Sequence, residues 1–202
     1  MSLYFAKIDR PIPELPSCER PIVQKHGQQI NSNKFLLARQ KLTEQELNQY
    51  IDVIPELKPF LIDGVVTDTK ILLPHIHDGE VHTIVNFYLK AENERTSFWE
   101  GDVKVDDRFV QDNGNGYWNV NFDYLKPIKS YVAETGDCYL LNPFEPHSVL
   151  PDSGDELEVI EKMISRSCMK LLRHKAKARR KIVQMYISLP IQECLERLNA
   201  KL

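Results

Sequence analysis

Four histidines occupy positions from which they could bind one metal ion. His75 and His77 form a His-x-His pair, His82 follows five residues later, and His147 ends the segment 136–147, GDCYLLNPFEPH. Neutral imidazole is the commonest protein ligand for Fe, Zn, Cu and Ni. The pattern therefore predicts a metal centre built from two segments that are distant in the sequence.

This centre requires a defined backbone geometry. Alternate residues of a strand point to the same side, so His75 and His77 project together if their segment is extended. We expect His147 to come from a second strand, with Pro143 and Pro146 stiffening the segment that aims it. Three protein ligands leave open positions for water, O2 or a bidentate substrate.

The residues after His77 offer two candidates for a fourth ligand. Strict alternation puts His82 on the opposite face of the strand from His77. A turn at Asp78-Gly79 would break that alternation, and Glu80 could bend inward at the same turn. The sequence leaves both ligands open.

Residues 60–165 read as many short strands without intervening helices. Runs rich in β-branched and aromatic residues alternate there with turn residues, and Asn113-Gly114-Asn115-Gly116 is a strong hairpin signal. Such a pattern indicates a mainly β fold, either a sandwich or a barrel.

Helices are expected on both sides of this β region. Thr43 and Glu46 form a capping box at the start of a helix over residues 42–54. After about residue 168 we expect one long helix or two, and residues 188–190 open a last one. The chain thus divides into an N-terminal strap and helix (1–58), a β domain (59–167) and a C-terminal helical tail (168–202).

The composition excludes several classes of protein. The 202-residue chain is 42% hydrophobic, enough for a packed core, and no apolar run reaches the ~18 residues of a transmembrane helix. Four cysteines lie far apart without a Cys-x-x-Cys pair, which favours free thiols in a reducing compartment. The first nine residues lack the layout of a signal peptide. We therefore expect a cytoplasmic protein without a membrane partner.

The net charge of −3 conceals a basic segment. Residues 170–181 hold seven Lys and Arg and no acidic residue, which leaves a net charge of −10 on the rest of the chain. Such a segment could contact the phosphates of a nucleic acid. Apolar residues flank it, however, so we expect a helix that packs on the β domain and turns its charges to solvent.

The histidine motifs resemble those of cupins, which belong to the double-stranded β-helix superfamily. Cupins carry His-x-His followed by a glutamate, and later a motif with Gly, Pro and His. His75 and His77 match the first pair, and His82 stands near the place of the glutamate. The second motif is matched by Gly136, Pro143 and His147. The resemblance implies a jelly-roll or cupin-like barrel over about residues 60–168.

The chain also resembles the Fe(II)/2-oxoglutarate oxygenases of the same superfamily. The run NFYLK at residues 86–90 is similar to the strand that follows their first metal motif. The interval from His75 to His147 suits this family better than a small cupin. His77, however, stands where these enzymes have a carboxylate ligand.

This second resemblance implies candidates for substrate binding. The family's arginine, which anchors 2-oxoglutarate about ten residues beyond the last histidine, has no counterpart at that position, and Lys162 and Arg166 are the nearest candidates to pair with a carboxylate. Tyr88 and Asn142 could hydrogen-bond a substrate. Their alternative roles are packing for Tyr88 and stabilisation of a turn for Asn142.

Together the resemblances imply a non-haem Fe(II) oxygenase that oxidises a small organic or peptidyl substrate, with 2-oxoglutarate as a candidate co-substrate. Zn, Ni and Mn are the alternative metals, because imidazole suits several divalent ions. A module that binds a metal or small ligand without turnover is the alternative function, and nucleic-acid contact through the basic segment is a third. The sequence leaves the oligomeric state open, a homodimer included.

Overall fold

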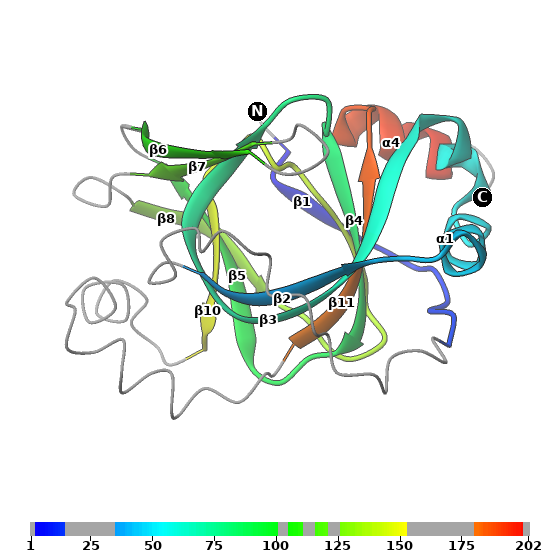
Figure 1. Cartoon of the computed structure of the whole chain (residues 1–202), viewed down its shortest axis with the longest axis horizontal. Helices are drawn as coiled ribbons and strands as arrows, with labels where there is room; N and C mark the ends of the chain where they lie inside the picture. The colour runs from blue at the N-terminus through cyan, green and yellow to red at the C-terminus, as the bar shows by residue number, and fades with distance from the viewer. Residues whose placement is uncertain are drawn as a thin grey trace.

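The computed structural model describes residues 3–14, 35–100, 105–110, 116–120, 126–152 and 180–199. Within these residues the fold is mainly β (Figure 1), and no helix is long and apolar enough to cross a membrane. The strands are β1 (Phe5–Ile8), β2 (Phe35–Lys41), β3 (Leu61–Asp78), β4 (Thr83–Lys90), β5 (Glu94–Glu100), β6 (Val105–Val110), β7 (Gly116–Val120), β8 (Lys126–Val132), β9 (Cys138–Leu141), β10 (His147–Pro151) and β11 (Arg180–Ile187). The helices are α1 (Glu44–Ile51), the 3-10 helix η2 (Pro55–Phe60) and α4 (Ile191–Asn199).

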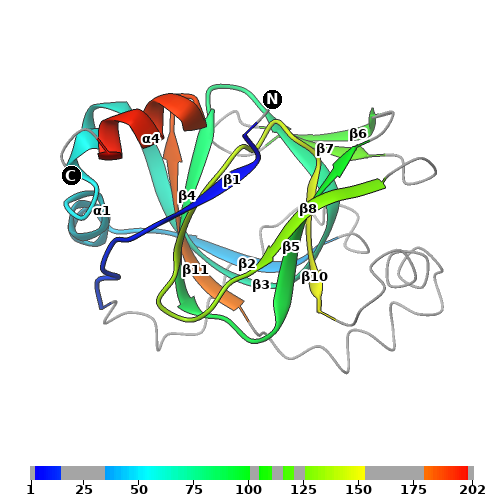
Figure 2. The same cartoon turned by 180° about the vertical axis from the view of Figure 1, so that it is seen from behind.

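These strands form one curled, antiparallel sheet. Its order is β1-β9-β4-β11-β3-β10-β5-β8, with β2 and β7 also paired to β3, and β6 paired to β7. The two ends of this order approach each other, because the rings of Phe5 on β1 and Tyr131 on β8 lie 4.7 Å apart between centroids. The sheet therefore curls around an interior, which Figures 1 and 2 show from opposite sides.

Strand β3 runs through two parts of this curled sheet, because its two halves pair with different strands. It is 18 residues long. Its first half pairs with β11, up to Thr69, and its last residues pair with β10 and β7. Register shifts against β2 and β10 lie between the two halves, and bulges of this kind bend a strand. The half with His75 and His77 therefore lies in the wall that also contains β10 and β5.

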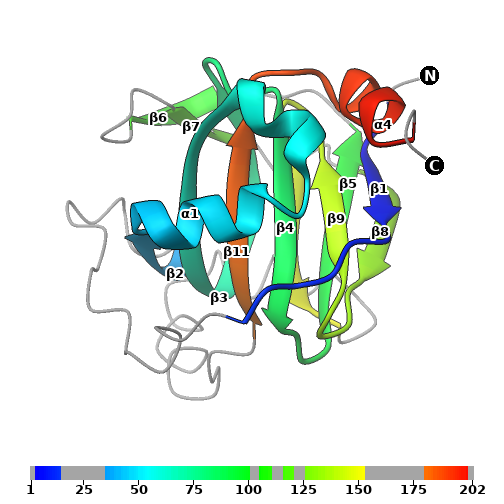
Figure 3. The same cartoon turned by 90° about the vertical axis from the view of Figure 1, so that its right-hand side faces the viewer.

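Strand β4 is covered on both faces. Ile84 and Tyr88 belong to a cluster in the interior, whereas Val85 and Phe87 belong to a second cluster outside the sheet. Residues of α1, η2 and α4 complete the outer cluster, and Figure 3 shows α1 crossing the outside of the sheet over β11. Burial on both faces explains why β4 reads as an almost continuous apolar run.

The predicted capping box of α1 is confirmed. The Glu46 N–H donates to Thr43 Oγ1 at 3.3 Å, and the Thr43 N–H donates to the Glu46 carboxylate at 2.8 Å. Leu42 and Leu47, on either side of this cap, both approach Gly64 of β3, where an added Cβ would lie 2.5 Å from Leu47 Cδ1. Glycine at this position lets the start of α1 pack closely on the sheet.

Two further local predictions are confirmed. Strands β6 and β7 pair antiparallel, as the hairpin signal at residues 113–116 predicts, although the loop 111–115 lies outside the described residues. Helix α4 begins directly after residues 188–190, and its buried side chains are Ile191, Cys194 and Leu198. Both features depend on residues close in the sequence.

The helical prediction for residues 180–187 is wrong, because this segment is β11, which lies between β3 and β4. Ile182 and Tyr186 face the interior, whereas Val183, Met185 and Ile187 face the outer cluster. Periodicity alone does not separate such a two-sided apolar run from a buried helix. Strands β1, β2 and β11 thus join the same sheet as the strands of residues 59–167, while residues 168–179 lie outside the described part of the chain.

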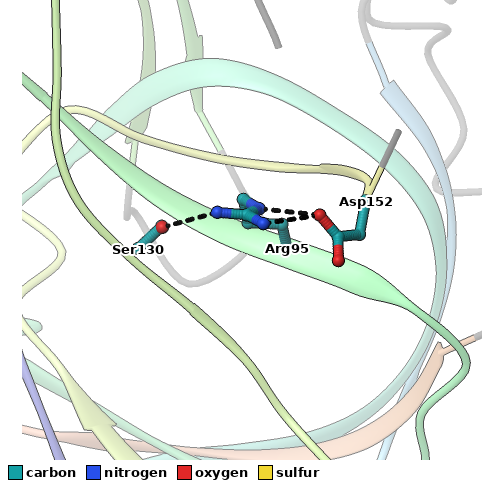
Figure 4. Close-up of polar contacts among 3 residues, drawn as sticks. All are labelled: Arg95, Ser130 and Asp152. Carbon is teal, nitrogen blue, oxygen red and sulfur yellow. Dashed lines mark hydrogen bonds and ion pairs between the residues drawn. The ribbon is translucent and has the colours of Figure 1, made fainter. Parts of the chain in front are cut away.

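Arg95 on β5 joins the strands on either side of it. Its Nε and Nη2 donate to Asp152 Oδ1, just beyond β10, at 2.9 and 2.6 Å, and its Nη1 donates to Ser130 Oγ on β8 at 3.1 Å (Figure 4). A partly exposed ion pair of this kind contributes about 0–1 kcal/mol. Its main effect is to hold in place the end of the strand that begins with His147.

Candidate metal centre

Three buried histidines converge in the interior. His75 on β3 is directly opposite His147 on β10, and His77 is two residues further along β3. The ring centroids of His75 and His147 lie 4.4 Å apart, and each is 5.2 Å from that of His77. One ligand atom from each ring lies within 4.8 Å of the others. His75 and His77 share one face because they stand at i and i+2 of β3, and the pairing of β10 with β3 brings His147 beside them.

Backbone carbonyls orient two of these histidines. His147 Nδ1 is 2.8 Å from the Glu145 carbonyl oxygen. A carbonyl oxygen can only accept, so Nδ1 carries the proton and Nε2 keeps its lone pair. The backbone N–H of His77 donates to the Pro143 carbonyl at 2.9 Å. The turn between β9 and β10 thus fixes both motifs relative to each other.

Burial keeps His147 neutral. Its pKa is lowered from the ordinary value of 6.5 to about 4, mainly by desolvation; the hydrogen bond to Glu145 opposes this shift, and the nearby charge of Arg180 adds to it. A neutral imidazole is the form that binds metal ions. His147 is therefore ready to act as a ligand at neutral pH without first losing a proton.

Acidification should destabilise the metal-free protein. The folded-state pKa of His147 lies below its unfolded value, so the unfolded chain binds more protons between pH 4 and 6.5. The contribution of neutral His147 to stability is complete above pH 6.5 and is lost as the pH falls to 4, and it amounts to about 3 kcal/mol. Denaturant unfolding from about pH 7 to about pH 4.5 should show this decline, and His147→Gln should show a smaller one. The same pH dependence in both proteins would rule out this role of His147.

A buried arginine that sequence reasoning missed also faces the interior. Arg180, at the start of β11, is 4% exposed. Its Nη1 donates to Thr96 Oγ1 at 3.3 Å, and its guanidinium carbon lies 4.9 Å from the centroid of the Tyr88 ring. Its Nε is buried without a hydrogen-bond partner. Within the described part of the chain, no acidic side chain forms an ion pair with Arg180.

Thr96 locates Arg180 relative to the histidines. Phe98 on β5 is opposite His147, and Thr96 lies two residues before it on the same face. Two residues of a strand span about 7 Å. Thr96, which accepts the Arg180 hydrogen bond, therefore lies about 7 Å along β5 from the position opposite His147.

Polar side chains also cross the interior face of β3, β11 and β4. Thr67 Oγ1 donates to Gln184 Oε1 at 3.1 Å, and Gln184 Nε2 donates to Asn86 Oδ1 at 3.1 Å. The interior thus offers hydrogen-bonding groups as well as aromatic and aliphatic surface. Such a mixture is typical of sites for small polar ligands.

Neither His82 nor Glu80, the candidates for a fourth ligand, belongs to the converging group of His75, His77 and His147. A bend forms at residues 79–80, with φ 99° at Gly79. It directs the following residues away from the three histidines: the His82 ring packs edge-on against Phe144 at 5.1 Å, and Glu80 is exposed.

Tyr88 and Asn142, the two hydrogen-bonding candidates, both make contacts within the protein. The Tyr88 hydroxyl shares a hydrogen bond of 2.8 Å with the Tyr131 hydroxyl, and its ring packs against Arg180. Asn142 Oδ1 accepts the N–H of Phe144 at 3.1 Å and so stabilises the turn before His147. The remaining candidates, Lys162 and Arg166, lie outside the described residues.

Comparisons with known proteins give little further information. Models of known protein families do not match the chain, and a search of curated proteins finds no match either. One solved structure, of an oxalate oxidase, aligns with 92% of this chain and 70% of its own chain at 10% identity, with a TM-score of 0.23. This similarity is too low to establish a shared fold, so the functional argument depends on the site itself.

Proposed function

We propose that this protein is a metal-dependent oxygenase with a cupin-like, double-stranded β-helix barrel, and that His75, His77 and His147 hold its metal ion. The convergence of three buried imidazoles carries the proposal. Fe(II) is the proposed metal, and Zn, Ni and Mn are the alternatives. The proposed substrate is a small organic or peptidyl molecule.

The residues present fit such an ion. Two nitrogen ligands, each about 2.1 Å from one ion, lie at most about 4.2 Å apart. The observed ligand atoms lie within 4.8 Å of one another, so small side-chain rotations would bring them into range. Three nitrogen donors suit Fe, Ni and Zn, and they leave coordination positions for other molecules.

Arg180 supports a carboxylate co-substrate such as 2-oxoglutarate. A buried guanidinium with an unsatisfied Nε is unfavourable unless a partner of opposite charge binds it. Arginine binds carboxylates through two parallel hydrogen bonds. The separation of about 7 Å along β5 suits a five-carbon dicarboxylate that reaches the histidines with one end and Arg180 with the other.

Each part of the chain has a distinct task in this proposal. When bound, an Fe(II) ion supplies the oxidation chemistry that amino acid side chains lack. The three histidines hold the ion, and Arg180 orients the carboxylate. Phe98, whose ring lies 5.7 Å from that of His147, belongs to the apolar wall that excludes water from the site.

Reconstitution with Fe(II) under anaerobic conditions tests this function. We expect 2-oxoglutarate at about 100 times its Kd to raise Tm by about 5–10 °C in the metal-loaded protein. Admission of O2 in the presence of ascorbate should then convert 2-oxoglutarate to succinate and CO2, with one oxygen atom entering succinate and the other reduced to water by ascorbate. Metal binding without succinate formation would favour the non-catalytic binding module, and the absence of bound metal after reconstitution would refute the proposal.

A further inference from the structure

We propose that Asn142 is a positioning residue of the metal centre, because it fixes the turn at residues 142–146 whose carbonyls hold His77 and His147. The inference rests on the proposed metal site, but it concerns how the metal-free chain prepares that site. The sequence identifies Asn142 as a candidate turn residue, and the contacts of this turn with His77 and His147 extend that role to the metal centre.

Three carbonyl groups of this turn each accept a hydrogen bond from a residue of a strand. Two of the donors belong to the candidate ligands, and the third belongs to β5. The pairs are Pro143 O with the His77 N–H at 2.9 Å, Glu145 O with His147 Nδ1 at 2.8 Å, and Pro146 O with the Trp99 N–H at 2.9 Å. The conformation of five residues therefore sets the relative placement of both histidine motifs.

Asn142 begins this turn and makes two hydrogen bonds that stabilise it. Its backbone N–H donates to the Tyr4 carbonyl on the chain entering β1 at 2.9 Å. Its side-chain oxygen accepts the N–H of Phe144 at 3.1 Å, the geometry by which Asn mimics a turn of the main chain. Pro143 and Pro146 have no N–H, so the Asn142–Phe144 bond satisfies one of the few amide donors inside the turn.

Loss of the Asn142–Phe144 hydrogen bond should alter the placement of His77 and His147, because it would move the carbonyl groups that accept hydrogen bonds from them. The Glu145 carbonyl determines which nitrogen of His147 carries the proton and how its ring is rotated. Residues that orient metal ligands typically change metal affinity by about 10–100-fold when they are replaced. Because Asn142 acts through the backbone, we expect a loss near 10-fold for Asn142→Ala.

Three variants of the full chain test this role. Asn142→Ala removes the acceptor, and Asn142→Asp keeps one in the same place. Thr135→Ala is the matched control, because Thr135 Oγ1 accepts the N–H of Ala91 at 3.0 Å in another exposed connection. The measurements are Zn²⁺ affinity by calorimetric titration and, without metal, the ¹⁵N resonance of His147 Nδ1.

We expect Asn142→Ala to weaken Zn²⁺ binding about 10-fold and to shift or broaden the Nδ1 resonance, while the other two variants resemble the wild type. An unchanged Nδ1 resonance in Asn142→Ala would overturn the inference. An equal loss in Thr135→Ala would also overturn it, since the effect would then be one of general stability. If the wild type binds no metal, the proposed function fails, but the resonance of the metal-free protein still decides the role of Asn142.

Discussion

Replacing both His75 and His147 by alanine is expected to abolish metal binding. The wild type should hold about one ion per chain after reconstitution, whereas His77 alone cannot retain an ion that needs three protein ligands. Elemental analysis after removal of excess metal gives the ratio directly. The same variant should form no succinate from 2-oxoglutarate.

His82→Ala is the matched control for this experiment. Its ring packs against Phe144 and lies outside the converging group, so the variant should bind the metal like the wild type. Far-UV circular dichroism should confirm that all three proteins are folded. Retention of a full equivalent of metal by the double variant would place the ion elsewhere and refute the proposed centre.

Replacing Arg180 by methionine is expected to remove 2-oxoglutarate binding while leaving the metal in place. Truncating one partner of a buried, hydrogen-bonded charge pair costs about 2–5 kcal/mol, which corresponds to a loss of affinity between about 30-fold and several thousand-fold. Calorimetric titration of the metal-loaded protein measures the loss. Arg180→Lys should rescue binding only in part, because an ammonium group lacks the two-pronged geometry of a guanidinium.

Two controls separate this effect from a folding defect. Lys181→Met removes the neighbouring positive charge of the same strand and should leave affinity nearly unchanged. Without ligand, Arg180→Met should be no less stable than the wild type, since replacing a buried charge by an apolar side chain of similar size is often neutral or stabilising. Tight 2-oxoglutarate binding by Arg180→Met would exclude Arg180 as the anchor.

The parts of the site that the sequence predicts depend on local geometry. His75 and His77 share a face because they are two residues apart on one strand, and the Thr43 cap depends on residues within one helical turn. The gathering of His147 with the first pair follows from the motif resemblance, which places both segments on strands of one barrel.

Arg180 escaped prediction because its position depends on pairing between distant segments. The resemblance to the 2-oxoglutarate oxygenases predicts the carboxylate anchor about ten residues beyond His147, whereas β11 begins well after that interval. Its residues are buried on both faces, so their pattern did not distinguish a strand from a buried helix. The local indication of a buried arginine is that Arg180 begins a segment that is apolar on both faces. This indication becomes useful only when the segment is interpreted as a strand.

The insertion of β11 between β3 and β4 also determines when the curled sheet can form. Strands β3 and β4 are close in sequence, yet the first half of β3 and the whole of β4 pair with β11. During synthesis, the edges of β3 and β4 that pair with β11 therefore lack this partner until Arg180–Ile187 leave the ribosome. Exposed apolar edges attract other chains, so we expect the nascent protein to be most prone to aggregation before β11 pairs with β3 and β4.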